Sequence, residues 1–405
     1  MSPKIEVYKG KILKELCFGK RMSASELSLR IQRSLPVTMR VLDDLVKEGM
    51  IFEKGFAPST GGRRPQVYAL APERMYAVAI AMDQLITKIA LVDLENFERL
   101  NEKRISLSLK NNPDALKELI SIISTYLNEL TVPKNKILGV GIGMPGFIDL
   151  TTGVNYSFLD NNGKSIPDRM QNELGLPVYM DNDSSLIALA ELKLGGSKGK
   201  NNVMVINLSW GIGLGMIVNG SLFRGYNGFA GEFSHIPLFN NNKLCDCGKM
   251  GCLETEASMK VLVQRVRNGI EAGRVTTIKS LPDDIDAAFQ MIIQAALRGD
   301  QLAVEIISEI VHIIGKGVAI LVHIMNPEEI VISGRGAAAG RLLLPPIQQA
   351  LNRYCIPRLT AHTQLRISEL NKFAELYGAA ALVAEQLGKQ IRNNRTNPEN
   401  YPFAA

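Results

Sequence analysis

Residues 231–254 read GEFSHIPLFNNNKLCDCGKMGCLE and hold three of the five cysteines in the chain. In a chain without secretory features, three cysteines within eight residues favour a metal site over disulfides. A nearby histidine completes a set of one nitrogen and three sulfurs, which suits tetrahedral Zn²⁺ with no open position. The ligands that we predict for this structural zinc site are His235, Cys245, Cys247 and Cys252.

The same segment carries Gly248 and Gly251, which permit the tight turn needed to bring the thiolates together. The alternative is that these cysteines are idle buried thiols. It is disfavoured because the segment is polar and rich in glycine.

Just before this segment, residues 205–215 read VINLSWGIGLG, an apolar run that leads into Gly211, Gly213 and Gly215. Glycines at this spacing usually let backbone N–H groups approach a phosphate. Trp210, the only tryptophan of the chain, stands at the mouth of this loop. The pattern leaves open a nucleotide site, the remnant of one, or a tight turn.

The composition of the 405 residues, 46% hydrophobic and 21% charged, is that of a soluble protein with two or three domains. The sequence contains no run of about 18 apolar residues, so we expect no membrane-spanning helix. The N-terminal residues carry scattered charges and lack the apolar stretch of a signal peptide. We therefore expect a cytoplasmic protein without membrane insertion.

The net charge of +6 is confined to the first seventy residues, which carry 13 Lys and Arg against 7 Asp and Glu. The other 335 residues carry 33 of each sign and balance. A basic module on a neutral body suggests a polyanionic partner for that module. A basic face that serves only solubility is the alternative.

Residues 1–72 predict a winged helix-turn-helix, with three short helices followed by two strands and a basic loop. Ser23 and Glu26 form a capping-box pattern before the second helix. The third helix spans about 35–48, and its apolar face is expected to include Val37 and Val41. A helix of this kind enters the major groove of double-stranded DNA, while the wing reaches the minor groove.

The residues expected to face DNA are Ser34, Thr38 and Arg40 from the third helix, with Arg63 and Arg64 at the wing tip. An arginine between glycine and proline suits a narrow, A·T-rich minor groove. Winged helices also serve as protein–protein modules, so charge and pattern favour DNA without excluding that alternative.

The body from residue 73 onward predicts an α/β protein in which three strands, a helix and further strands occur twice. We expect one lobe over 73–187, completed by a C-terminal helix at 371–390, and a second lobe over 188–370. The Asn219–Gly220 pair predicts a type I′ hairpin turn in the second lobe. This repeated plan predicts two similar α/β lobes with a cleft between them.

These segments resemble the ROK family, named for repressors, open reading frames and kinases. The Gly-Glu-x-x-His and Cys-x-Cys-Gly-x-x-Gly-Cys-x-Glu pattern of 231–254 is similar to the diagnostic segment of that family. GIGMPGFID, DND, NPEEIVISG and GAAAL also stand in family order. The resemblance covers nearly the whole chain. It implies an actin-like, hexokinase-like pair of lobes, here in the repressor branch, which carries the winged helix.

The resemblance also implies a sugar site beside the metal. By that likeness, the residues that bind sugar hydroxyls are Glu232, His235, Glu254, Asn182 and Asp183. Zinc would hold one imidazole nitrogen of His235 and leave the other facing the sugar. Asp183 matches the general base of ROK kinases, but taken alone it also fits a helix N-cap.

The phosphate loops depart from the kinase pattern. Where ROK kinases read Asp-x-Gly-Gly-Thr-Lys, this chain retains Asp83, Thr87 and Lys88 but places Leu85 and Ile86 at the two glycines. Where the kinases read Gly-Thr-Gly-x-Gly, Ser209 and Trp210 precede Gly211. Phosphoryl transfer depends on positioning the phosphates, so damage to both loops predicts weak or absent ATP binding.

We therefore expect a sugar-responsive, DNA-binding transcriptional regulator, a repressor rather than an enzyme, whose effector is a sugar or sugar phosphate. A homodimer or homotetramer would read a pseudo-palindromic operator. Two alternatives remain open: an active sugar kinase fused to a DNA-binding domain, for which the retained Asp183 argues, and a regulator controlled by a protein partner.

Overall fold

The computed structural model describes residues 3–56 and 64–388 of the chain. It divides into two compact units, Met1–Asp183 with Leu376–Ala405, and Ser184–Glu375. The two units are described separately below.

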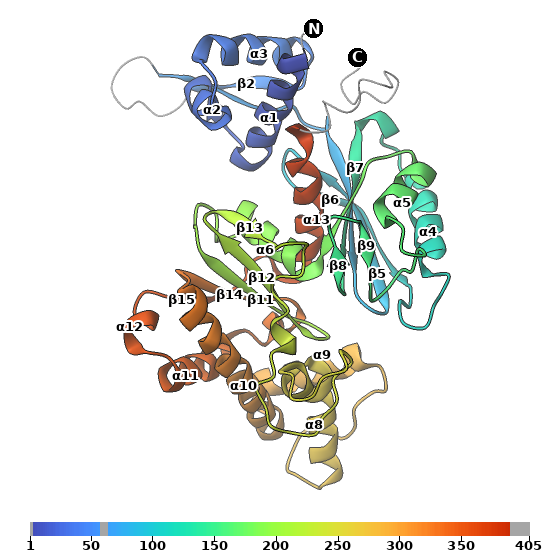
Figure 1. The fold of residues 1–405 in the computed structure, drawn as a ribbon, viewed down its shortest axis with the longest axis vertical. Coiled ribbons are helices and arrows are strands. Elements are labelled where there is room, and N and C mark those ends of the chain that lie inside the picture. Colours follow the sequence, from blue (N-terminus) through green and yellow to red (C-terminus); the bar gives the residue numbers. More distant parts are fainter. Residues whose placement is uncertain (1–2, 57–63, 389–405) are drawn as a thin grey trace. The chain divides into compact units, whose positions relative to one another are not determined.

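The N-terminal module of the first unit is a winged helix-turn-helix, as predicted. Its elements are α1 (Pro3–Gly19), β1 (Met22–Ser23), α2 (Ala24–Ile31), α3 (Leu35–Lys47), β2 (Ile51–Phe56) and β3 (Gln66–Leu70). The strands form a sheet in the order β1-β3-β2 beside the three helices (Figure 1). The predicted capping box is present, since Ser23 and Glu26 exchange both hydrogen bonds at the start of α2.

The buried face of α3 differs from the prediction at one position, where Thr38 takes the place expected for Val37. Thr38 is fully buried, together with Val41, Leu42 and Leu45, whereas Val37 is exposed. These four buried positions follow the spacing i, i+3, i+4 and i+7 of a single helix face. The Thr38 hydroxyl can enter the core because it donates a hydrogen bond to the carbonyl oxygen of Ser34 at 3.1 Å. The expectation that Thr38 faces DNA is therefore wrong.

The first unit continues with a five-stranded sheet in the order β10-β7-β4-β5-β6. Helices α4 and α5 lie on one side of this sheet and α13 on the other (Figure 1). The α13 backbone packs closely, because a Cβ at Gly141 of β7 would stand 2.0 Å from the carbonyl oxygen of Ala379. The elements of this part are β4 (Tyr76–Met82), β5 (Ile86–Asp93), β6 (Arg99–Ser106), α4 (Ala115–Glu129), η1 (Lys134–Lys136), β7 (Ile137–Met144), β8 (Ile148–Asp149), β9 (Val154–Asn155), α5 (Ile166–Leu174), β10 (Val178–Asn182) and α13 (Ala374–Glu385).

The second unit repeats this plan with a sheet in the order β13-β12-β11-β14-β15. Numbered by their place in the chain, the strands of both sheets follow the order 5-4-1-2-3, which confirms the predicted pair of similar α/β lobes. Its strands are β11 (Val203–Leu208), β12 (Ile212–Val218), β13 (Ser221–Phe223), β14 (Glu329–Ser333) and β15 (Gln364–Ile367). Asn219 and Gly220 both have positive φ, as the predicted type I′ turn requires.

Most helices of the second unit enclose its main hydrophobic core on one side of the sheet. They are η2 (Phe233–His235), α7 (Glu254–Ala257), α8 (Met259–Glu271), α9 (Ile285–Leu297), α10 (Gln301–Met325), η3 (Arg335–Leu342), α11 (Leu344–Tyr354) and α12 (Pro357–Thr360). Helix α6 (Asp183–Lys193) packs on the other face of the sheet in a smaller cluster, and η4 (Asn371–Phe373) precedes α13. Helix α10 is long and apolar enough to cross a membrane. However, 61% of its most apolar window is buried within the protein, as in the core helix of a globular domain.

Candidate metal centre and effector site

The predicted zinc ligands come together in the second unit. The nitrogen and sulfur atoms of His235, Cys245, Cys247 and Cys252 all lie within 4.8 Å of one another. His235 Nδ1 is 3.5 Å from Cys245 Sγ, and Cys247 Sγ is 3.6 Å from Cys252 Sγ. A tetrahedral ion bound to sulfur at about 2.3 Å separates its ligands by about 3.8 Å. The cluster therefore fits a four-coordinate metal ion.

Two glycines shape the backbone of this cluster. Gly248 and Gly251 both have positive φ, near 80°, a conformation that most side chains resist. A Cβ at Gly251 would also stand 2.2 Å from the carbonyl oxygen of Phe239. Short antiparallel bridges join Pro237 to Cys252 and Leu244 to Met250, which closes the loop on itself. Burial raises the pKa of the Cys252 thiol, and a bound cation would favour its thiolate form.

His235 uses its two ring nitrogens in different directions. Nδ1 faces Cys245, while Nε2 lies 3.9 Å from Glu232 Oε2. The Glu232 side chain is exposed and that of His235 is half-buried. A metal on Nδ1 would fix the ring orientation and hold Nε2 as a polar group next to an accessible carboxylate.

Glu254 begins α7 and lies beside the glycine-rich loop between β11 and β12. A Cβ at Gly211 would stand 3.1 Å from Glu254 Oε2. Because α7 starts only two residues after Cys252, the metal loop positions this half-buried carboxylate. The second unit thus carries Glu232, His235 and Glu254 on the metal loop and its flanks.

Asn182 and Asp183 belong to the end of the first unit. Asn182 is the last residue of β10, opposite Met144 at the end of the parallel strand β7. Its side chain donates a hydrogen bond to the carbonyl oxygen of Gly146 at 3.5 Å. Helix α6 begins at Asp183, so the half-buried Asp183 carboxylate lies in the first turn of the helix. Both residues therefore stand at the carboxyl edge of parallel strands, where α/β proteins bind ligands.

The first degenerate phosphate loop is closed by its own aspartate. Asp83 Oδ1 accepts hydrogen bonds from the backbone N–H groups of Leu85 and Ile86, both at 2.8 Å. Neither Leu85 nor Ile86 has positive φ. Thr87, which matches the threonine of the kinase motif, is buried within the sheet. Two N–H groups of the loop are thus already satisfied within the protein.

The glycines of the second loop serve packing. A Cβ at Gly213 would stand 1.9 Å from Ser184 Oγ, and one at Gly215 would stand 2.4 Å from Ala188 Cβ. Both neighbours lie on α6, so small residues on β12 let this helix approach the strand. None of Gly211, Gly213 and Gly215 has positive φ. The loop is closed by a hydrogen bond from the Ser209 N–H to the Gly211 carbonyl oxygen at 3.0 Å.

Trp210 is a core residue of the second unit, 8% exposed. The guanidinium carbon of Arg335 lies 5.6 Å from the centre of its ring, and Arg335 also pairs with Asp286 at 2.7 Å. A cation over an indole face stabilises this arrangement. Sequence patterns missed Arg335 because it follows the loop by 125 positions, and only the parallel pairing of β11 with β14 brings it close.

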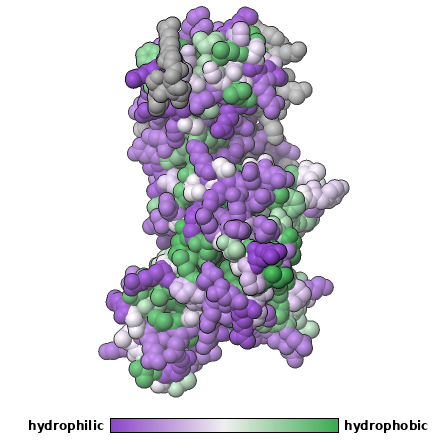
Figure 2. Space-filling view, turned by 90° about the vertical axis from the view of Figure 1, so that its left-hand side faces the viewer, coloured by the Kyte–Doolittle hydropathy of each residue, from purple (hydrophilic) through white to green (hydrophobic). Residues whose placement is uncertain are grey.

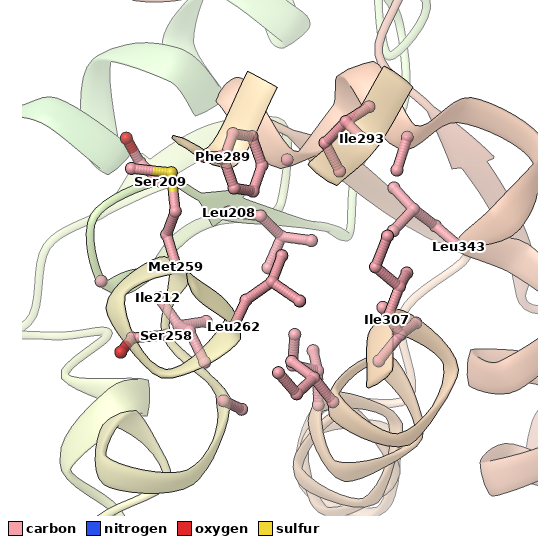
Figure 3. A pocket seen from close by; sticks show the side chains of 17 residues that line it. Leu208, Ser209, Ile212, Ser258, Met259, Leu262, Phe289, Ile293, Ile307 and Leu343 are labelled. Carbon is pink, nitrogen blue, oxygen red and sulfur yellow. The ribbon is translucent and has the colours of Figure 1, made fainter. Parts of the chain in front are cut away.

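A small apolar pocket, partly open to solvent, adjoins this loop (Figure 3). Its walls include Leu208, Ile212, Phe289, Ile307 and Leu343. Among the labelled side chains, only Ser209 and Ser258 carry oxygen. The pocket therefore offers few polar groups for a nucleotide base.

The residues expected to face DNA fall into three groups. Ser34 is exposed just before α3, Arg40 is exposed on α3, and Arg64 is exposed just before β3. Thr38 is buried, as described above. Arg63 lies outside the described residues. The face shown in Figure 2 is mostly hydrophilic over the N-terminal module at its top, with isolated hydrophobic residues.

Comparisons with known proteins agree with this architecture. A xylose repressor from Caldicellulosiruptor bescii is 29% identical over 382 residues, which is 93% of this chain and 95% of that protein. A glucokinase from Halalkalibacterium halodurans is 34% identical over 268 residues, 65% of this chain and 81% of its own length. The crystal structure of a ROK family transcriptional regulator, a homologue of the Escherichia coli MLC protein, shares the fold. Its TM-score is 0.80 at 24% identity, over 96% of this chain and 98% of that one. The ROK family profile matches residues 78–386. The chain belongs to the ROK family.

Proposed function

We propose that this protein is a sugar-responsive transcriptional repressor without kinase activity, acting in the cytoplasm on double-stranded DNA. One observation carries the proposal: a winged helix-turn-helix is joined to a ROK domain in which Asp83 takes up the backbone N–H groups of Leu85 and Ile86. The xylose repressor matches the chain across both parts, whereas the glucokinase matches about two thirds of it.

The effector is a sugar or sugar phosphate held by Asn182, Asp183, Glu232, His235 and Glu254. Carboxylates, an amide and an imidazole can each donate to or accept from vicinal hydroxyls. Zn²⁺ bound by His235, Cys245, Cys247 and Cys252 supplies no chemistry. It holds the loop that carries Glu254 and fixes the His235 ring.

Sugar binding can release DNA only if the two states differ in their affinity for the effector. The N-terminal module contacts the rest of the first unit through Phe18, which stacks on Phe97 with ring centres 6.0 Å apart. Lys14 pairs with Glu385 of α13 at 3.6 Å. These contacts link the DNA-binding module to the turn between β5 and β6 and to α13, which covers one face of the first sheet. A homodimer or a dimer of dimers would present two such modules to a pseudo-palindrome.

The second candidate function is a sugar kinase. It is supported by the retained residues Asp83, Lys88 and Asp183 and by the similarity to a glucokinase. One experiment separates the two. The purified full-length protein is first used to enrich its site from randomised duplex DNA. Binding to that duplex is then titrated with xylose, hexoses, N-acetylhexosamines and their phosphates, and ADP release from ATP is followed in the same samples.

Release of DNA by one sugar without ADP release supports the repressor. Sugar-dependent ADP release at ordinary turnover supports the kinase, and indifference to every sugar supports control by a protein partner. Glu254→Gln should abolish the sugar response and preserve DNA binding. The matched control is Glu271→Gln, the same change at an exposed carboxylate of α8, which should leave both unchanged.

A further inference from the structure

The exposed surface of the first half of α3 is largely apolar. Leu35, Val37 and Met39 are 44%, 38% and 36% exposed, and Pro36 is exposed between them. Thr38, the polar residue in this stretch, is buried. The exposed polar side chains over 34–40 are therefore those of Ser34 and Arg40.

The orientation of these side chains is held by the start of the helix. Ser34 precedes α3 with extended backbone, and its own side chain makes no capping hydrogen bond. Its carbonyl oxygen instead accepts from both the N–H and the hydroxyl of Thr38, at 3.0 and 3.1 Å. This double contact fixes Thr38 inward, so that Val37 and Met39 lie on the two flanks of the exposed face of α3, with Pro36 and Arg40 between them.

Charge favours nucleic acid as the occupant of this surface. The module carries nearly twice as many basic as acidic residues. Arg33, Arg40 and Lys47 are exposed at and along α3, together with one exposed carboxylate, Asp43. Exposed apolar side chains on both flanks of a helix in a basic module match the major groove, where charged phosphates flank the base edges. A protein partner is the competing occupant, and the experiment below distinguishes it.

The base edges in the major groove present hydrogen-bonding groups with one apolar exception, the C5-methyl group of thymine. We propose that Leu35, Val37 and Met39 recognise thymine methyl groups, and that over residues 34–40 Ser34 and Arg40 read the hydrogen-bonding groups. This inference rests on the proposed function, because it requires that α3 enters DNA. The inference predicts that the operator half-site is rich in thymine at the positions that α3 covers.

The test uses the enriched duplex with deoxyuridine in place of thymidine at one position at a time. Deoxyuridine keeps every hydrogen-bonding group and lacks only the methyl. Each methyl in contact with α3 should contribute about a three- to five-fold increase in affinity, the value of one buried methyl-sized group. Replacement at thymines outside the α3 contacts should leave affinity unchanged.

Two near-isosteric variants of the full-length protein assign the contacts. Val37→Thr and Met39→Gln keep the side-chain shape and exchange an apolar end for a polar one. Each should weaken binding three-fold or more. Each should also remove the effect of deoxyuridine at one position, because that methyl no longer has an apolar partner. The matched control is Val46→Thr, the same change at a residue 36% exposed but about 13 Å further along the helix. It should bind like the wild type.

The outcomes separate this inference from the proposed function. An enriched duplex that tolerates deoxyuridine at every position overturns the thymine-reading role and leaves the repressor intact. Variants that bind DNA normally but change the sedimentation coefficient would assign these apolar side chains to a protein contact, which also overturns the inference. If no duplex is enriched at all, DNA recognition itself fails. Thermal melting of each variant at the wild-type temperature confirms that it is folded.

Discussion

Gly213 on β12 lies against Ser184 on α6, so closely that a Cβ at Gly213 would stand 1.9 Å from Ser184 Oγ. Ser184 is buried and its hydroxyl oxygen accepts a hydrogen bond from Asn207 Nδ2 at 3.1 Å, so it cannot easily move. Gly213→Ala should therefore lower the free energy of unfolding by about 1–3 kcal/mol, the usual cost of overpacking. Urea denaturation measures this loss.

The control is Gly211→Ala in the same loop. The nearest atom to its added Cβ would be the end of the flexible Glu254 side chain at 3.1 Å, and Gly211 has no positive φ. Its loss of stability should be clearly smaller. Equal losses would contradict the packing role of Gly213 and restore a common role for the loop glycines, such as binding a phosphate.

Metal removal should destabilise the second unit. Cys252→Ser removes a fully buried ligand, so the purified variant should lose its zinc and melt at a lower temperature. A strong chelator should lower the melting temperature of the wild type in the same way. Cys355→Ser, at a buried cysteine outside the cluster, should keep one zinc per chain. A wild-type protein purified without zinc, yet equally stable, would refute the metal site.

Glu329 should make stability depend on pH. This buried carboxylate pairs with Arg366 at 2.8 Å and Lys200 at 2.7 Å and accepts a hydrogen bond from Ser197 at 2.6 Å. Burial alone would raise the pKa of Glu329, but the hydrogen bonds from Arg366, Lys200 and Ser197 outweigh it and hold the pKa below 4.5. A lowered pKa stabilises the folded state above pH 4.5, and this contribution is lost as the pH falls through the folded-state pKa.

Glu329→Gln should therefore cost about 3 kcal/mol at pH 7, the low end for breaking a buried pair, since Arg366 keeps Glu191 as a partner. The difference between wild type and variant should shrink as the pH falls below 4.5. Glu328→Gln, at the exposed neighbouring position, should cost less at pH 7. A difference that stays constant down to pH 3 would contradict the assignment.

Trp210 gives a direct optical readout of the second core. Because it is the only tryptophan and is buried, its emission should be blue-shifted and poorly quenched by iodide. Arg335→Met removes the cation from the ring face and should change the emission intensity. Arg341→Met, at an exposed arginine of η3, should leave the spectrum as it is. A spectrum typical of exposed indole in the wild type would contradict this placement.

Local patterns predicted the features that depend on neighbouring residues. The Ser23 and Glu26 capping box, the Asn219–Gly220 turn and the cysteine spacing of the metal loop each act within a few positions. Hydrophobic periodicity predicted the three N-terminal helices, but it placed Val37 in the core. Rotating the buried face of α3 by one residue changes the hydrophobic periodicity little, and periodicity alone does not predict that a threonine hydroxyl is buried.

The sequence by itself determined the donor set of the metal centre, the basic character of the N-terminal module and the loss of the kinase glycines at Leu85 and Ile86, because residue type and spacing decide these. Only the tertiary structure decided that Asp83 occupies the N–H groups of that loop, that Gly213 and Gly215 serve the approach of α6, and that Val37 rather than Thr38 faces outward. The reason is physical. A glycine or a helix face has meaning only against the atoms packed on it, and those atoms come from another element or, as with Ser34 and Thr38, from the exact start of the helix.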